Sequence, residues 1–238
     1  MKKIRLIENG GERAYWNMGV DEALMELSPL PTLRLYSWSP SAVSIGYFQS
    51  LRDEVDVEEC KRQGIDIVRR RTGGGTVFHK DELTYSFTTQ EYPEDILQSY
   101  RLICGAVVKG LKEISVEAKF VPLNDLLIGS KKFSGNAQTR SDGKLLQHGT
   151  LLLKVDPELM FSVLMVSNEK LKDKLIKNAK ERVTGLGISF SEAKKALRLG
   201  FSKTFNSELA VSSLTEKEKK LAKGKAKTYA SGDWLWKR

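Results

Sequence analysis

The stretch IDIVRRRTGGGTVFHKDELTYSFTT, residues 65–89, holds three apolar runs separated by a glycine triplet and by a short polar turn. The runs at 65–69, 75–79 and 83–89 each predict a β-strand, because they contain β-branched and aromatic residues between turn-forming residues. In the last run apolar and polar residues alternate, which is typical of a strand with one face toward a core. This part of the chain is therefore expected to form sheet around a glycine-rich connection.

The flanking residues extend the strand-rich region. Residues 32–48, TLRLYSWSPSAVSIGYF, predict two strands broken by a Ser-Pro-Ser sequence at 39–41. Residues 99–114 carry apolar side chains at helical spacing and predict a helix. Further strands are predicted at 116–121, 125–129 and 145–154.

After residue 155 the pattern becomes helical. Residues 156–166 begin with Asp-Pro, a good start for a helix, and residues 169–181 place apolar side chains on one helix face. The sequences at 189–192 and 215–218 have the Ser/Thr-x-x-Glu spacing of a capping box. A strand-rich part followed by a helix-rich part predicts the α+β class and not an alternating doubly wound α/β fold.

Composition excludes several classes of protein. The chain has 238 residues, of which 40% are hydrophobic and 29% charged, as in ordinary globular proteins. No run reaches the ~18 apolar residues of a membrane span, and the N-terminus lacks the apolar stretch of a signal peptide. Cys60 and Cys104 are too few for a disulfide framework or a structural zinc site. We expect a soluble, cytoplasmic protein without a membrane partner.

The net charge of +9 is unevenly distributed. Residues 214–238 contain eight basic and three acidic residues and are expected to form a basic helical tail. A basic protein can bind nucleic acid, but no zinc-finger spacing, RNP-like motif or RGG repeat accompanies the charge. We therefore expect no nucleic-acid partner. The tail is either a solvated basic helix or a docking surface for an acidic protein.

The glycine triplet is the first candidate site. Gly73–Gly75 follow three arginines, Arg69–Arg71. Glycine permits positive φ and leaves backbone N–H groups open, and arginine offers paired donors to an anion. The segment could bind a phosphate or carboxylate, or it could be a flexible hairpin with solvated arginines. It is not a Walker A loop, because no Gly-Lys-Ser/Thr follows at the required spacing.

Two other segments carry polar groups. A tight turn at 129–130 should bring Asn124 and Asp125 near Lys132 across a hairpin, where an acid and a lysine could hold a metal-bound nucleotide and an acyl oxygen. The alternative is an ordinary surface ion pair, which stabilises little. His79 and His148 are each more typical of core or hydrogen-bonding histidines than of catalysts. Neither has a serine, cysteine or aspartate motif beside it that would indicate a triad.

Taken together, these motifs resemble the lipoate–protein ligase family of the biotin/lipoate ligase superfamily. The similarity covers nearly the whole chain. Its motifs are NMGVDEAL at 17–24, SIGYFQ at 44–49, RRRTGGGTVFH at 69–79, NDL at 124–126, KKFSGNA at 131–137 and HGTLL at 148–152. The resemblance implies one mixed-sheet catalytic domain over residues 1–238 and no C-terminal accessory domain in this chain. The archaeal-type arrangement, with the accessory domain as a separate small protein, is therefore expected.

The resemblance also implies an activity. ATP, with Mg²⁺, would activate lipoate to lipoyl-AMP, and the lipoyl group would pass to a lysine of a lipoyl domain. Such domains belong to 2-oxoacid dehydrogenase complexes or to the glycine-cleavage H protein. Lys132 would be the catalytic residue, stabilising charge on the acyl oxygen and α-phosphate, and Asp125 would help to hold Mg²⁺. The implied substrate- and nucleotide-binding residues are Arg70, Gly73, Gly74, Gly75, Val77, Phe78, His79, Asn124, Asp125, Ser134, Gly135, Ala137, His148, Gly149 and Thr150.

Other activities remain open. The acyltransferase branch of the superfamily uses a cysteine nucleophile shortly before the segment equivalent to 124–136, and residues 115–123 contain none. Cys104 falls on an apolar helix face and Cys60 in a polar connection, so both are interpreted as structural. HKDELTYS at 79–86 and AQTR at 137–140 nevertheless resemble that branch. The alternatives are a lipoyl or octanoyl transferase that uses acyl carrier protein without ATP, a biotin ligase, and a non-catalytic lipoate- or nucleotide-binding module.

Overall fold

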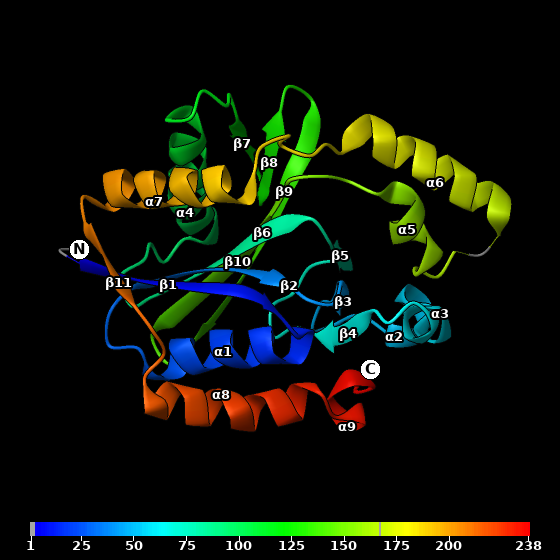
Figure 1. The fold of residues 1–238 in the computed structure, drawn as a ribbon, viewed down its shortest axis with the longest axis horizontal. Helices are drawn as coiled ribbons and strands as arrows, with labels where there is room; N and C mark the ends of the chain where they lie inside the picture. The colour runs from blue at the N-terminus through cyan, green and yellow to red at the C-terminus, as the bar shows by residue number, and fades with distance from the viewer. Residues whose placement is uncertain (1–2, 167) are drawn as a thin grey trace.

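The computed structural model describes residues 3–166 and 168–238, and in this part of the chain eight strands form the main sheet (Figure 1). Their order is β11-β1-β2-β6-β10-β9-β8-β7. The bounds are β1 Lys3–Glu12, β2 Thr32–Trp38, β6 Glu82–Thr89, β7 Lys119–Val121, β8 Asp125–Ile128, β9 Lys131–Ser141, β10 Lys144–Leu152 and β11 Glu208–Ser212.

The main sheet is mixed, as expected for the α+β class. Strand β1 pairs in parallel with both β2 and β11, whereas the pairs from β2 through β6, β10, β9 and β8 to β7 are antiparallel. The sequence pattern did not indicate β1 or β11. Their pairing joins Lys3 to Glu208, so it depends on contacts between the two ends of the chain that local spacing does not reveal.

A second, three-stranded sheet has the order β4-β3-β5, with β3 Ala42–Ile45, β4 Asp66–Arg69 and β5 Val77–His79. Two short helices, α2 Leu51–Glu54 and α3 Val57–Arg62, pack beside it. Cys60 lies on α3 and is fully buried in this small core. The expectation that Cys60 occupies a polar connection is therefore wrong, because α3 places Cys60 in the same buried apolar cluster as Val43 and Ile45.

Helices cover both faces of the main sheet (Figure 1). On one face lie α4 Ile96–Lys112 and α7 Phe190–Phe205, and on the other lie α1 Ala14–Leu27 and α8 Glu216–Tyr229. The larger core forms where α4 and α7 meet the sheet, and there the rings of Phe87 and Phe201 lie 5.2 Å apart. Burying each such ring stabilises the fold by roughly 1.5–3 kcal/mol.

The basic C-terminal region is part of the fold. Both predicted capping boxes are present, one at the start of α7 and one at the start of α8. Helix α8 buries Ala222 and Ala226 against α1, and its Glu218 accepts a 2.6 Å hydrogen bond from Arg5. The idea of a freely solvated helix is thus wrong for this side of α8, because alanines at helical spacing give the helix an apolar stripe.

The remaining helices are α5 Pro157–Ser162, α6 Glu169–Arg182 and α9 Gly232–Leu235. Helix α5 ends four residues before the predicted boundary of residue 166, at a segment whose backbone bonds to Glu54 and Asp56. The residue after the α6 cap, Thr184, donates a 2.9 Å backbone hydrogen bond to Lys132 and so joins α6 to β9. None of the helices in the described residues is both long and apolar enough to span a bilayer.

Candidate active site

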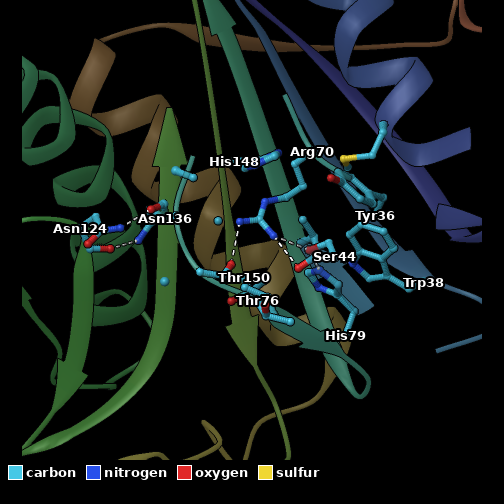
Figure 2. A pocket seen from close by; sticks show the side chains of 18 of the residues that line it. Tyr36, Trp38, Ser44, Arg70, Thr76, His79, Asn124, Asn136, His148 and Thr150 are labelled. Carbon is cyan, nitrogen blue, oxygen red and sulfur yellow. Dashed lines mark hydrogen bonds between the residues drawn. The ribbon is translucent and has the colours of Figure 1, made fainter. Parts of the chain in front are cut away.

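Two adjoining cavities lie between the small sheet and strands β9 and β10 of the main sheet. The first has a volume of about 170 Å³ and the second about 260 Å³. Thr76, Val77, Lys132, Gly135 and Thr150 line both, so the cavities meet at these residues. Figure 2 shows Asn124 and Asn136 on one side, with Tyr36, Trp38 and His79 on the other.

Most of the predicted site residues converge on this region. The first cavity is lined by Arg70, Gly74, Gly75, Val77, His79, Asn124, Lys132, Gly135, Ala137, His148, Gly149 and Thr150. The second adds Phe78 and Ser134, whereas Gly73 and Asp125 line neither cavity. Sequence reasoning missed Met18, Tyr36, Trp38, Ser44, Thr76, Thr84 and Asn136 in the first cavity. The alternation of Tyr36 and Trp38 at the end of one predicted strand was the available signal.

Arg70 holds the glycine triplet in place. Each guanidinium nitrogen donates within the protein: Nε to Thr72 Oγ1 (3.3 Å), Nη1 to the carbonyl and hydroxyl oxygens of Ser44 (2.7 and 2.8 Å), and Nη2 to the carbonyls of Gly73 and Gly75 (3.1 and 2.9 Å). Burial lowers the pKa of Arg70 to about 10, which leaves it cationic at neutral pH. Its predicted contact with a substrate anion stays a prediction.

The glycine triplet lies against the loop after β3. Gly74 has φ +93°, a conformation that L side chains rarely adopt. A Cβ placed on Gly46 would stand only 2.0 Å from the Gly74 carbonyl oxygen. Both positions therefore require glycine, one for its backbone angle and the other for close approach.

Lys132 and Asp125 form the predicted cross-hairpin pair. Lys132 Nζ lies 2.7 Å from Asp125 Oδ1, and the lysine side chain remains 43% exposed. The ammonium extends over Gly135, where an added Cβ would stand 3.2 Å from Nζ. Within residues 3–166 and 168–238, no three His, Cys, Asp or Glu side chains are grouped so that they could hold a metal ion.

Asn124 and Asn136 join β9 to the hairpin before it. Asn124 Nδ2 donates to the Asn136 carbonyl (2.5 Å), and Asn136 Nδ2 donates to the Asn124 carbonyl (2.8 Å), as the dashed lines in Figure 2 show. Tyr85 donates to Asn136 Oδ1 at 2.6 Å. A Cβ on Gly149 would lie 1.9 Å from that oxygen, so Gly149 makes room for Asn136. The predicted nucleotide contact of Asn124 stays a prediction.

Two buried histidine relays flank Arg70. In the first relay, Glu82–His79–Ser44, Glu82 Oε1 lies 2.8 Å from His79 Nδ1 and His79 Nε2 lies 2.6 Å from Ser44 Oγ. Trp38 stacks on His79, with ring centroids 4.0 Å apart and an interplanar angle of 18°. No local sequence motif indicates this arrangement, because Ser44 is on β3 and His79 on β5.

The second relay is Asp21–His148–Thr72. His148 Nε2 lies 2.8 Å from Thr72 Oγ1, and His148 Nδ1 lies 3.6 Å from Asp21 Oδ2. Burial lowers the pKa of His148, although Asp21 opposes the effect. Burial alone would raise the pKa of Asp21, but the adjacent Arg34 and hydrogen bonds hold it below its ordinary value. Thr72 does not line the first cavity.

Neither cysteine lines the two cavities. Cys104 is buried in the larger core, where Gln147 Nε2 donates to its Sγ at 3.5 Å, and this confirms its placement on an apolar helix face. Burial raises the pKa of both Cys60 and Cys104 to about 12. Both are therefore protonated thiols at neutral pH and poor nucleophiles.

Solved structures of lipoate ligases have the same fold. The bipartite lipoate protein ligase of Thermoplasma acidophilum, described with its E2 lipoyl domain, matches with a TM-score of 0.91 and 33% identity, over 99% of this chain and 96% of that chain. Lipoate-protein ligase A bound with ATP matches with a TM-score of 0.84 and 30% identity, over 99% and 98% of the two chains.

The curated relatives point to a different reaction. The octanoyltransferase LipM of Anoxybacillus flavithermus is 34% identical over 98% of both chains, and that of Bacillus subtilis is 30% identical over 98% of both. By name these relatives are group transferases and not ligases. The prediction of an ATP-dependent lipoate–protein ligase is therefore wrong. The expected use of ATP, Mg²⁺ and lipoyl-AMP depended on that prediction and is not retained.

The family itself agrees with the sequence-based resemblance. The matching family is described as the lipoyl protein ligase A/B catalytic domain, and the match spans residues 13–201. This range contains both cavities' shared residues, both histidine relays and the Lys132–Asp125 pair. The chain belongs to the lipoyl protein ligase A/B catalytic domain family.

Proposed function

We propose that this chain is an acyltransferase that moves an octanoyl or lipoyl group from a thioester donor to a lysine of a lipoyl domain, without consuming ATP. The names of the octanoyltransferase relatives support octanoyl as the group that is transferred. The T. acidophilum ligase is described together with a lipoyl domain, which supports a lipoyl domain as the acceptor. Residues 1–238 form one catalytic domain in this proposal. A separate accessory protein stays a prediction; the T. acidophilum ligase is described as bipartite, whereas the octanoyltransferase relatives are matched over 98% of their own length.

The observation that carries the proposal is the position of Lys132 where the two cavities meet. A thioester carbonyl is already activated, so an amine can displace the thiol without prior adenylation. Negative charge builds on the carbonyl oxygen during that attack. The Lys132 ammonium, oriented by Asp125 at 2.7 Å, can stabilise this charge at the junction.

The two cavities suit the two parts of such a substrate. The first contains the apolar surfaces of Met18, Trp38 and Val77, which favour an acyl chain. The second contains Phe78 and Met160 together with the cations Lys80 and Lys154. It can admit the flexible arm that brings the thioester or the acceptor lysine. Asp81 and Asp156 line it as well, and Lys80 pairs with Asp156 at 3.0 Å, so its charges are mixed.

The test is acyl transfer in a purified system. The chain is incubated with octanoyl-acyl carrier protein and a lipoyl domain in the absence of ATP, and the lipoyl domain is measured by intact-mass spectrometry. A gain of one octanoyl group on the acceptor lysine is expected. A lipoyl domain with that lysine changed to arginine is the control for the site of modification.

A parallel reaction contains ATP, Mg²⁺ and free octanoate or lipoate in place of the thioester. Modification of the lipoyl domain only in this second reaction would contradict the proposal. Modification in neither reaction, with a lipoyl domain shown to be a competent acceptor, would contradict it as well.

A further inference from the structure

The first cavity is lined by a serine, Ser44, to which the sequence motifs assign no role. Four aliphatic hydroxyl side chains line it, those of Ser44, Thr76, Thr84 and Thr150, and Tyr36 adds a phenol. Of these side chains, only Ser44 has a hydrogen bond to a histidine nitrogen among the contacts seen, with its hydroxyl oxygen 2.6 Å from His79 Nε2. The opposite nitrogen of the same ring lies 2.8 Å from Glu82 Oε1. This order of hydroxyl, imidazole and carboxylate is that of an activated serine nucleophile.

We propose that Ser44 carries the acyl group as an oxygen ester between donor and acceptor. The inference rests on the proposed transferase function, and it names the covalent intermediate of that reaction. Both cysteines lie outside the cavities, so a thioester on the enzyme has no candidate among the described cavity residues. In the proposal, the Ser44 hydroxyl takes the place of a cysteine thiol as the group that holds the acyl chain between the two steps of the transfer.

The hydrogen-bond roles around Ser44 are consistent with attack by its oxygen. Arg70 Nη1 donates to Ser44 Oγ at 2.8 Å, which leaves the hydroxyl proton free to point at His79 Nε2. The adjacent guanidinium charge stabilises the developing alkoxide. Glu82 is a positioning residue: it accepts from His79 Nδ1 and from Thr84 Oγ1, and these bonds fix the imidazole tautomer that faces Ser44.

The two steps balance in atoms and protons. In the first, the Ser44 oxygen forms a bond to the thioester carbonyl carbon while the carbon–sulfur bond breaks. His79 takes the hydroxyl proton and gives it to the leaving thiolate. In the second, the acceptor lysine, entering as a neutral amine, forms the amide bond while the ester carbon–oxygen bond breaks. His79 returns the amine proton to Ser44.

The surroundings of Ser44 protect such an ester. Ser44 is 0% exposed, so an acyl carbonyl reaches its oxygen only when the first cavity widens, and Trp38 covers the His79 ring. Closure against water slows hydrolysis of a reactive intermediate, so the acyl group can wait for an amine. The thiol product can leave before the lipoyl domain arrives, and both can use the second cavity in turn. Ping-pong kinetics follow from this order.

The experiment uses the full chain with octanoyl-acyl carrier protein and no acceptor. Intact-mass and peptide mass spectrometry should find one octanoyl group on Ser44. The double variant Cys60→Ala/Cys104→Ala serves as a matched control without thiols and should form the same adduct. Addition of a lipoyl domain should discharge the adduct and transfer the octanoyl group to the domain.

Two variants test the role of the hydroxyl. Ser44→Ala should lose adduct formation and lower transfer by at least ~10³-fold. Ser44→Cys keeps a nucleophile at the same position and should carry the octanoyl group as a thioester, which neutral hydroxylamine cleaves and which an oxygen ester resists. Circular dichroism and donor binding establish whether each variant is folded.

The outcomes separate this inference from the proposed function. If the wild-type chain octanoylates the lipoyl domain but no adduct forms on Ser44, and folded Ser44→Ala keeps its rate, the transferase function stands and the covalent role is overturned. An adduct on another residue has the same consequence. If wild type transfers no acyl group from the thioester to a competent lipoyl domain, both the function and the inference fail.

Discussion

The two relays beside Arg70 contain the same kinds of group and are both buried, with Ser44 0% and Thr72 1% exposed, but they differ in position relative to the first cavity. In the Glu82–His79–Ser44 relay, the hydroxyl lines the first cavity and both contacts are 2.8 Å or shorter. In the Asp21–His148–Thr72 relay, the hydroxyl lies outside that cavity and the carboxylate contact is 3.6 Å. Arg70 donates to both hydroxyls and therefore does not distinguish them.

The carboxylates also differ. Asp21 is shared among several donors, including Arg34 at 2.8 Å and Tyr36 at 2.9 Å, so it organises the polar core beneath the site. Glu82 Oε2 is buried and has no hydrogen-bond partner in the described residues, so the first relay is not fully satisfied. This difference indicates that a histidine between a hydroxyl and a carboxylate does not itself make a catalytic site. The proposed reaction also requires the hydroxyl to border the cavity that would hold the carbonyl, and of the two hydroxyls only that of Ser44 belongs to a lining residue of the first cavity.

The largest effect is expected from breaking the first relay. His79→Gln removes the base between Glu82 and Ser44 while it preserves much of the side-chain volume. Acylation of the enzyme by octanoyl-acyl carrier protein should slow by at least ~10³-fold in single-turnover kinetics, with donor affinity nearly unchanged. An acylation rate within tenfold of the wild-type rate would contradict the role of His79 as a base and would give it a structural role like that of His148 in the second relay.

The next effect concerns the cation at the cavity junction. Lys132→Ala should lower transfer to the lipoyl domain by ~10²- to 10³-fold, because an oxyanion would lose its stabilising charge. Steady-state octanoylation measures the loss. The matched control is Lys131→Ala, since Lys131 is exposed and its ammonium bonds only to the Lys180 carbonyl among the contacts seen. Equal losses in the two variants would contradict the role of Lys132.

Breaking the second relay should affect stability more than activity. Thr72→Val leaves His148 Nε2 and Arg70 Nε without their hydroxyl partner in a buried region. The free energy of unfolding should fall by ~1–3 kcal/mol in urea denaturation. Acyl transfer by the folded variant should fall by less than about tenfold, or ~1.4 kcal/mol of barrier. A loss as large as that of His79→Gln would remove the distinction between the relays.

The smallest effect is the pH dependence of stability. Burial holds the pKa of His148 below its ordinary 6.5, so the native state binds fewer protons than the unfolded chain as pH falls below 6.5. Stability is full above 6.5 and decreases below it, by at most about 1.4 kcal/mol per pH unit. Asp21, held below 3.8, loses its contribution only at still lower pH. His148→Gln should flatten the urea-denaturation profile between pH 6.5 and 3.8, and an unchanged slope would refute the assignment.

Sequence patterns predicted the parts of the fold that depend on neighbouring residues. The Lys132–Asp125 pair lies within one hairpin, and each capping box lies within one helical turn, so spacing alone specified them. The α+β class followed from the change of period near residue 155. Strand β11 escaped detection because its five residues are stabilised by pairing with β1 at the other end of the chain.

For the candidate site, too, the sequence predicted groups within one motif but not contacts between distant strands. The glycine triplet, Lys132 and the two histidines were identified from motifs, whereas the first relay was not. Its serine and histidine are 35 residues apart and meet only because β3 and β5 pair with Ser44 beside Val77. A hydroxyl on a buried strand gives no signal in the sequence until that register is known.

The stacked rings of Trp38 and His79 give the molecule a built-in optical probe. A protonated imidazole quenches an excited indole more strongly than a neutral one, and Trp38 lies against the ring that exchanges protons in the proposed reaction. The chain has four tryptophans, so the difference in emission between the wild type and a Trp38→Phe variant isolates the signal of this ring pair, with no label added to the enzyme.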